Sequence, residues 1–151
     1  MNVGRNISTP LPIPQRVSVH IEERGAGARI ARVTIDNQRK LNTLNSALMS
    51  EFVAALKILR TDKLLRAAVI TGAGEKAFIG GADINEVAQL NARTGRAFIT
   101  RLHRCCDAVR QLPVPVIARI QGYALGGGLE LAASCDIRIA AGTAVFGMPV
   151  A

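Results

Sequence analysis

The sequence is poor in aromatic residues and contains no long apolar run. Among its 151 residues there is no Trp, one Tyr and four Phe, so we expect an aliphatic core without platforms for base stacking. No stretch approaches the roughly 18 uninterrupted apolar residues that a membrane-spanning helix requires. We therefore expect no membrane span, and the scarcity of aromatic residues argues against a nucleic-acid partner.

Cysteine is scarce, and a secretion signal is missing. Three cysteines, an odd number in a chain without such a signal, favour reduced thiols in the cytoplasm. Cys105, Cys106 and Cys135 also lack the paired spacing of a zinc site, so we expect core thiols and no metal. Residues 1–16 have three prolines and no apolar segment, which predicts a disordered lead-in before one domain of residues 17–151.

Positive charge is in excess, with 19 Lys and Arg against 11 Asp and Glu, a formal net charge of +8. Such an excess can indicate a polyanionic partner, either nucleic acid or a phosphate-rich ligand. The basic residues are scattered from Arg60 to Arg110 rather than clustered. A solvated basic surface is the favoured interpretation, and a polyanionic partner stays open.

Hydrophobic periodicity predicts an α/β fold. Alternation on both sides of a glycine-rich turn predicts a β-hairpin of residues 17–21 and 30–35. The resulting order is β-β-α-β-α-α-β-α-β. Helices are expected from Asn45 or Ser46 to Leu59 and over residues 84–90, 94–112 and 129–135, with further strands over residues 66–71, 114–120 and 137–140.

A first glycine pair follows one of these strands. Gly72 and Gly74 fit the beginning of a G-x-G-x-x-A dinucleotide motif, which needs a helix opening at that point and an acidic residue about 20 positions later. Residues 78–81 interrupt any such helix, and residues 91–94 contain no acid. A plain turn is therefore favoured.

A second glycine cluster is a stronger candidate for a functional site. Residues 126–128 are three glycines between an apolar strand and an apolar helix with one acid, Glu130. Bare N–H groups at a helix start stabilise developing negative charge, although a tight turn would also place glycine there. A buried unpaired carboxylate is costly, so Glu130 is expected to be either paired in the core or catalytic. Residues 78–83 form another backbone-exposing loop that could serve the same anion.

These segments resemble the crotonase (enoyl-CoA hydratase/isomerase) superfamily. Residues 77–84 (AFIGGADI) are similar to its AF(C/A)AGADI segment, and residues 115–131 (PVIARIQGYALGGGLEL) to its PVIAAVNGYALGGGxEL signature. Residues 39–44 (RKLNTL) are similar to its ALNAL loop. The resemblance covers residues 17–149 and implies an α/β fold, the ClpP/crotonase-like spiral of ββα units, with the C-terminal part missing.

The resemblance also implies a site. The ligand would be an acyl-CoA thioester, with no further cofactor because coenzyme A is part of the substrate, and the full-length protein would be a homo-oligomer, a trimer or hexamer. Backbone N–H groups of Ala82 and Gly127 would form the oxyanion hole, and Glu130 would be the first of two glutamates that add water to an enoyl-CoA. The substrate-binding residues would be Lys40, Leu41, Ala82, Asp83, Ile84, Asn85 and Gly127.

The sequence departs from the family pattern at two positions. The second catalytic glutamate of the family follows an F-G-x-P sequence, and Val150 stands there. Asn85 replaces a lysine that many relatives carry. Three functions therefore stay open: syn hydration of a 2-enoyl-CoA, double-bond isomerisation with a single acid, and a truncated non-catalytic fragment that associates with partners or binds a polyanion such as RNA.

Overall fold

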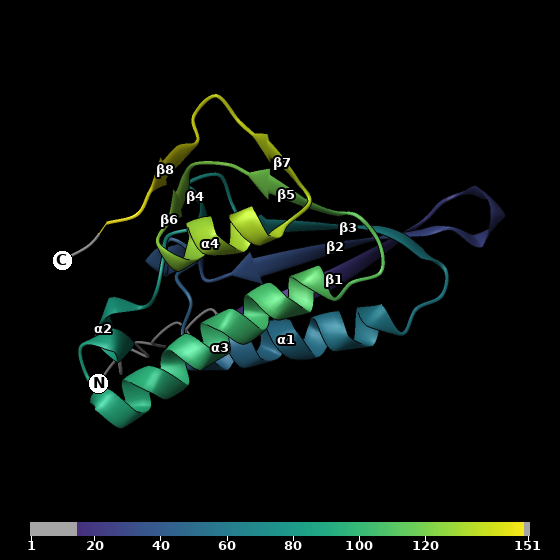
Figure 1. The fold of residues 1–151 in the computed structure, drawn as a ribbon. Coiled ribbons are helices and arrows are strands. Elements are labelled where there is room, and N and C mark those ends of the chain that lie inside the picture. Colours follow the sequence, from purple (N-terminus) through teal and green to yellow (C-terminus); the bar gives the residue numbers. More distant parts are fainter. Residues whose placement is uncertain (1–14, 150–151) are drawn as a thin grey trace, which may run out of the picture.

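The computed structural model describes residues 15–149 as two β-sheets with four α-helices (Figure 1). The larger sheet has the order β1-β2-β3-β5-β7, and the smaller one the order β4-β6-β8. The larger sheet comprises β1 Arg16–Glu23, β2 Arg29–Asp36, β3 Leu65–Gly72, β5 Val116–Ile120 and β7 Ile137–Ala140. The smaller comprises β4 Ala77–Ile79, β6 Tyr123–Leu125 and β8 Val145–Gly147. The helices are α1 Ser46–Arg60, α2 Ile84–Val87, α3 Ala92–Arg110 and α4 Gly127–Ser134.

The chain winds as a spiral in which each turn adds one strand to each sheet. β3 and β4 precede α2 and α3, β5 and β6 precede α4, and β7 and β8 follow. The turn before these follows the same plan, because β2 leads to a short segment at Leu44 that pairs with Ala82 beside β4, and then to α1. The predicted α/β spiral of ββα units is therefore confirmed.

The predicted hairpin is present, and the other strands of the larger sheet are parallel. β1 pairs antiparallel with β2, whereas β2, β3, β5 and β7 pair in parallel. β1 begins at Arg16, the last residue that the sequence assigned to the lead-in. Residues 1–14 of that lead-in lie outside the described residues.

Side-chain caps define where α1 and α3 begin. Asn45 caps α1, since its side-chain oxygen accepts a hydrogen bond from Leu48 N–H at 2.9 Å. α3 begins two residues earlier than Thr94, because Asn91 and Thr94 form a reciprocal capping box. In Figure 1 these two helices lie side by side below the larger sheet.

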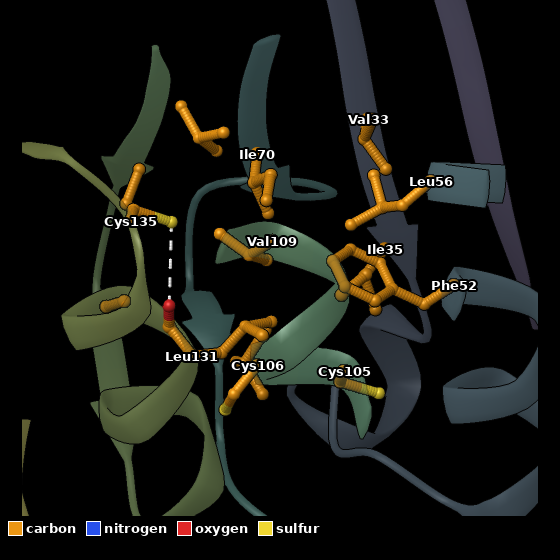
Figure 2. Close-up of a cluster of buried hydrophobic side chains, with 14 of the residues drawn as sticks. Val33, Ile35, Phe52, Leu56, Ile70, Cys105, Cys106, Val109, Leu131 and Cys135 are labelled. Atoms are coloured by element: carbon orange, nitrogen blue, oxygen red, sulfur yellow. Dashed lines mark hydrogen bonds between the residues drawn. The ribbon is translucent and has the colours of Figure 1, made fainter. Parts of the chain in front are cut away.

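The core is mainly aliphatic, with Phe52, Phe78 and Phe98 as its aromatic members (Figure 2). Phe52 of α1, Val109 of α3 and Leu131 of α4 converge on Ile35 and Ile70 of the larger sheet. The inward positions predicted for α3 are all buried: Phe98, Leu102, Cys105, Cys106 and Val109.

The three thiols are free and buried, so the prediction of core cysteines is confirmed. Burial raises the pKa of both Cys105 and Cys135 to about 12. The Sγ of Cys135 lies 3.5 Å from its acceptor, the backbone oxygen of Leu131, one helical turn earlier. A protonated thiol behaves as a small apolar side chain, which suits these positions.

The short strands of the smaller sheet differ from the sequence prediction. Residues 78–83 were expected to be a loop, yet β4 occupies Ala77–Ile79, and neither β6 nor β8 was predicted. α2 ends at Val87, three residues before Leu90, and α4 begins at Gly127 instead of Leu129. Strands of three residues show no period in the sequence, because pairing with distant segments defines them.

Candidate active site

The two glycine segments lie at the same edge of the smaller sheet. β4 pairs in parallel with β6, so residues 80–82 and 126–127, which follow these strands, leave the sheet side by side. A Cβ atom added to Gly126 would lie 4.0 Å from the Cα of Gly81, and one added to Gly81 would lie 3.4 Å from the Leu125 oxygen. The structure therefore brings together two loops that the sequence could not place.

Glycine is required here for conformation and for packing. Gly81 has φ 112° and Gly126 has φ 52° with ψ −120°, both in the region that other residues avoid. Gly128 has an ordinary φ, but a Cβ on it would lie 2.2 Å from the Ile79 oxygen. These glycines allow α4 to start directly against β4.

Each loop presents backbone N–H groups at this edge. The first hydrogen bond of α4 runs from Glu130 N–H to the Gly126 oxygen at 3.1 Å, so the N–H of Gly127 precedes the helical ladder. Leu44 N–H donates to the Gly81 oxygen and Asp83 N–H donates to the Leu44 oxygen, each at 2.8 Å. These two hydrogen bonds form a parallel bridge in which Ala82 stands opposite Leu44. In such a bridge the N–H of Ala82 itself points away from Leu44, toward β6. Two donors from different segments are the elements of an oxyanion hole.

Glu130 lies in the first turn of α4 and is exposed. Burial of this carboxylate, expected from the apolar character of the helix, is wrong, because the buried residues of α4 lie on another face: Gly128, Leu131, Ala132 and Ser134. Its side chain makes none of the hydrogen bonds or ion pairs found within residues 15–149. Solvation of this carboxylate removes the need for a structural partner.

Lys40 and Asp83 contact each other. Lys40 Nζ donates to Asp83 Oδ2 at 2.8 Å, and Asp83 Oδ1 accepts from Asn85 N–H at 2.9 Å. The Asp83 side chain is 7% exposed, whereas that of Lys40 is 49% exposed. The hydrogen bond from Lys40, opposed by burial and reinforced by the Asn85 N–H, holds the pKa of Asp83 below its ordinary value.

The other predicted binding residues surround two shallow depressions. Lys40, Asp83 and Asn85 line an open depression of about 470 Å³. Leu41 borders a separate depression of about 410 Å³, formed with the turn that follows β3. Ile84 is 80% exposed at the start of α2. Val150 lies outside the described residues.

Two supporting residues escaped the sequence prediction. Asn42 donates from its amide to the oxygens of Ala73 and Ala77, each at 2.9 Å, and thereby fastens its turn to the start of β4. Glu86 accepts hydrogen bonds from the N–H and the hydroxyl of Ser46, which joins α2 to the start of α1. The sequence signals for Asn42 are its place in the segment similar to the ALNAL loop and the tolerance of asparagine for left-handed backbone.

Three simpler expectations can be compared with the same residues. The segment after Gly72 leads into β4 and not into a helix, so the dinucleotide motif is a turn. Within residues 15–149, no helix has the length and apolar character needed to cross a bilayer. The same range contains no group of three His, Cys, Asp or Glu side chains that could hold a metal ion.

Fold and site together define an α/β protein of ββα units with two glycine-bordered N–H donors at one sheet edge. The family model described as enoyl-CoA hydratase/isomerase matches residues 25–151. The chain therefore belongs to the enoyl-CoA hydratase/isomerase family.

Individual relatives agree with this assignment. The chain is 42% identical over 132 residues to the short-chain-enoyl-CoA hydratase of Clostridium acetobutylicum, covering 87% of this chain and 49% of that protein. It is 37% identical over 121 residues to the crotonyl-CoA hydratase of Syntrophomonas wolfei, covering 80% and 46%.

A solved structure shows the same fold. The crystal structure of an enoyl-CoA hydratase from Bacillus anthracis superposes with a TM-score of 0.81 at 39% identity, covering 89% of this chain and 50% of that one. The chain thus spans about half the length of the relatives it matches.

Proposed function

We propose that this chain binds an acyl-CoA thioester and stabilises the oxyanion that forms when the thioester becomes an enolate. The observation that supports this most directly is the convergence of residues 80–82 and 126–127 at one edge of the smaller sheet. Ala82 N–H and Gly127 N–H would donate to the thioester oxygen from two sides. Each such donor contributes about 10²–10³ in rate when it is aimed at the developing charge.

Glu130 is the acid/base group of the proposed reaction. It sits three residues after Gly127, in the first turn of α4. With the carbonyl polarised, C3 of a 2-enoyl-CoA accepts water and C2 accepts a proton, and Glu130 would hold the water or carry the proton. Two proposals go with this chemistry: a homo-oligomer located in the cytoplasm, and no cofactor apart from the CoA of the substrate.

Double-bond isomerisation is the second candidate, and the acids beside residues 80–82 favour it. Asp83 is paired with Lys40, and Glu86 accepts hydrogen bonds from Ser46. Neither carboxylate is available to replace the second glutamate of a hydratase. Isomerisation moves one proton between two carbons of the enolate, so Glu130 alone could carry it.

The experiment is ligand binding followed by turnover. The chain is titrated with acetoacetyl-CoA, whose enolate absorbs ultraviolet light more strongly than the keto form, and is then assayed with crotonyl-CoA and with a 3-enoyl-CoA. Saturable binding with enolate absorbance supports the oxyanion hole, and the two assays separate hydration from isomerisation. No binding of the thioester, together with salt-sensitive binding of RNA, would instead support a non-catalytic role.

A further inference from the structure

The turn that carries Lys40 has an unusual backbone. Leu41 has φ 53° and Asn42 has φ 55°, so two successive residues other than glycine are left-handed. Residues other than glycine seldom adopt this conformation, and it persists only where the surroundings hold it. Asn42 is held through its amide by Ala73 and Ala77, and its Oδ1 accepts from Asn37 N–H at 2.9 Å.

This strained turn forms the outer support of the Ala82 segment. Gly80 N–H donates to the Leu41 oxygen at 2.8 Å, and the bonds of Leu44 to Gly81 and Asp83 follow. Three backbone hydrogen bonds therefore fix the residues on both sides of Ala82. None of them uses the N–H of Ala82 itself.

A side-chain ion pair between Lys40 and Asp83 adds to these backbone hydrogen bonds. The two residues are 43 positions apart, and their bond of 2.8 Å joins the strained turn to the residue that follows Ala82. The Asp83 carboxylate is nearly buried and is held on both oxygens, by Lys40 and by Asn85 N–H. A charge held in this way resists rotation of the Asp83 backbone. The Ala82 N–H lies one peptide earlier, in the Gly81–Ala82 unit whose oxygen accepts from Leu44 N–H, so holding Asp83 against Leu44 limits the movement of that unit too.

We propose that Lys40 and Asp83 are positioning residues: their ion pair locks the strained turn against residues 80–83 and so fixes the direction in which Ala82 presents its N–H. The use of that donor rests on the proposed function, whereas the lock is a property of the free protein. The family resemblance names both residues among those that would line the CoA channel. In the free protein their side chains bind each other.

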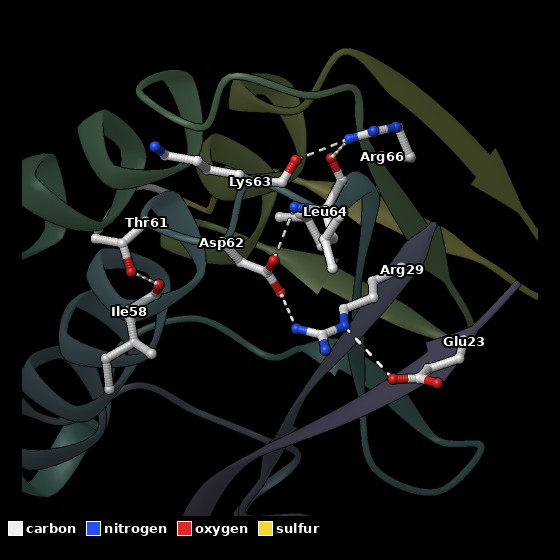
Figure 3. A network of polar contacts seen from close by, with 9 residues as sticks. Glu23, Arg29, Ile58, Thr61, Asp62, Lys63, Leu64 and Arg66 are labelled. Atoms are coloured by element: carbon white, nitrogen blue, oxygen red, sulfur yellow. Dashed lines mark hydrogen bonds and ion pairs between the residues drawn. The ribbon is translucent and has the colours of Figure 1, made fainter. Parts of the chain in front are cut away.

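The chain contains a matched control. Asp62 pairs with Arg29 at 3.2 Å and accepts from Leu64 N–H at 2.9 Å, the same local arrangement as at Asp83. Figure 3 shows this second network, which joins the end of β1 and the start of β2 to the turn after α1. Removing it tests the general effect of losing such a pair without touching residues 80–83.

The test is amide hydrogen exchange in the free 151-residue chain, for Lys40→Met, Asp83→Asn, the double variant, Lys40→Arg and Asp62→Asn. We expect Asp83 and Leu44 N–H to exchange about tenfold faster in Lys40→Met, Asp83→Asn and the double variant, because a hydrogen bond to a charged group is lost. Lys40→Arg should restore slow exchange, and Asp62→Asn should leave these two amides unchanged. Unchanged exchange in folded Lys40→Met would overturn the proposal.

A second readout links the lock to the ligand. For equal amounts of bound acetoacetyl-CoA, we expect Lys40→Met to show less enolate absorbance than the parent and Asp62→Asn to show the same. Equal absorbance in Lys40→Met and the parent would overturn the positioning role even if exchange were faster. A parent chain that binds no thioester contradicts the proposed function, and the exchange rates then decide the lock on their own.

Discussion

At the scale of single residues, Glu130 is exposed, so we expect its substitution to affect proton transfer and to change the stability of the fold little. A solvated carboxylate without a partner among residues 15–149 stabilises the fold little, whereas the Glu86 carboxylate accepts hydrogen bonds from Ser46 at the start of α1. The two acids therefore form a natural pair for substitution.

We expect Glu130→Gln to abolish exchange of acyl-CoA α-protons with deuterated water, because Gln cannot accept a proton. Its free energy of unfolding should change by less than about 0.5 kcal/mol, as for other exposed positions. Glu86→Gln should instead lose about 1 kcal/mol, because its hydrogen bonds from Ser46 would no longer go to a charged group. Mass spectrometry of the ligand and urea unfolding measure the two effects. A destabilised Glu130→Gln that still exchanged protons would indicate a structural role.

The ion pair at Asp83 predicts how stability depends on pH. Its pKa is held below the value of about 3.9 that an unfolded Asp shows, chiefly by the hydrogen bond from Lys40. The native state therefore binds fewer protons than the unfolded chain, so the pair stabilises the fold above about pH 4 and the contribution is lost as pH falls through the lowered pKa. Urea unfolding of the parent and Asp83→Asn between neutral and acidic pH should show the difference between them shrinking on acidification. A constant difference would contradict this.

At the scale of elements, composition and periodicity were sufficient for the long helices and for the strands of the larger sheet. They could not predict β4, β6 or β8, because three-residue strands depend on partners far away in the chain. The glycine segments were identified as candidate donors, but their meeting required the parallel pairing of β4 with β6. The Lys40–Asp83 contact spans 43 positions and leaves no local signal.

The start of α4 allows a matched pair of substitutions at Gly127. Gly127→Pro removes the N–H at the first helical position, where proline is tolerated. Gly127→Ala keeps the N–H, and its Cβ would meet the flexible Leu102 side chain at 3.2 Å. We expect the proline variant to lose about 10²–10³ in α-proton exchange rate and the alanine variant to retain most of it. Circular dichroism checks that both fold. Equal activities would remove Gly127 from the oxyanion hole.

The junction between α4 and β4 predicts a large loss of stability at Gly128. An added Cβ would lie 2.2 Å from the Ile79 oxygen, so α4 must move, and Gly128→Ala should destabilise by roughly 1–3 kcal/mol. Gly95 in α3 has open space around it, and Gly95→Ala should stabilise by about 0.5–1 kcal/mol through helix propensity. Denaturant unfolding of both variants measures the contrast. A neutral Gly128→Ala would mean that α4 can shift freely.

At the scale of the whole molecule, a run of large exposed apolar side chains lies on the last two strands. The apolar segments before them contribute less, because Leu131 of α4 and Val116 of β5 are buried. The large exposed side chains of β7, β8 and the residue after them are instead Ile137, Ile139, Val145, Phe146 and Met148. β7 and β8 are the last strands of their sheets among residues 15–149.

We expect the 151-residue chain to self-associate through this surface, because exposed apolar patches and open strand edges both favour association. Ile139→Lys, at a side chain that is 60% exposed, should raise the monomer fraction. Ile58→Lys, at an equally apolar and 72% exposed position on α1, should leave it unchanged. Size-exclusion chromatography with light scattering measures both. A monomeric parent chain would contradict the prediction.

The spiral also bears on how such a protein can diverge. Ala82 and Gly127 follow the smaller-sheet strands of two successive turns, and backbone pairing between those strands sets their separation. The connections that leave the turns, such as residues 88–91 between α2 and α3, are outside that pairing. Mutation can therefore lengthen or reshape these connections without moving the two donors. The architecture separates variation in its connections from the geometry of its backbone donors.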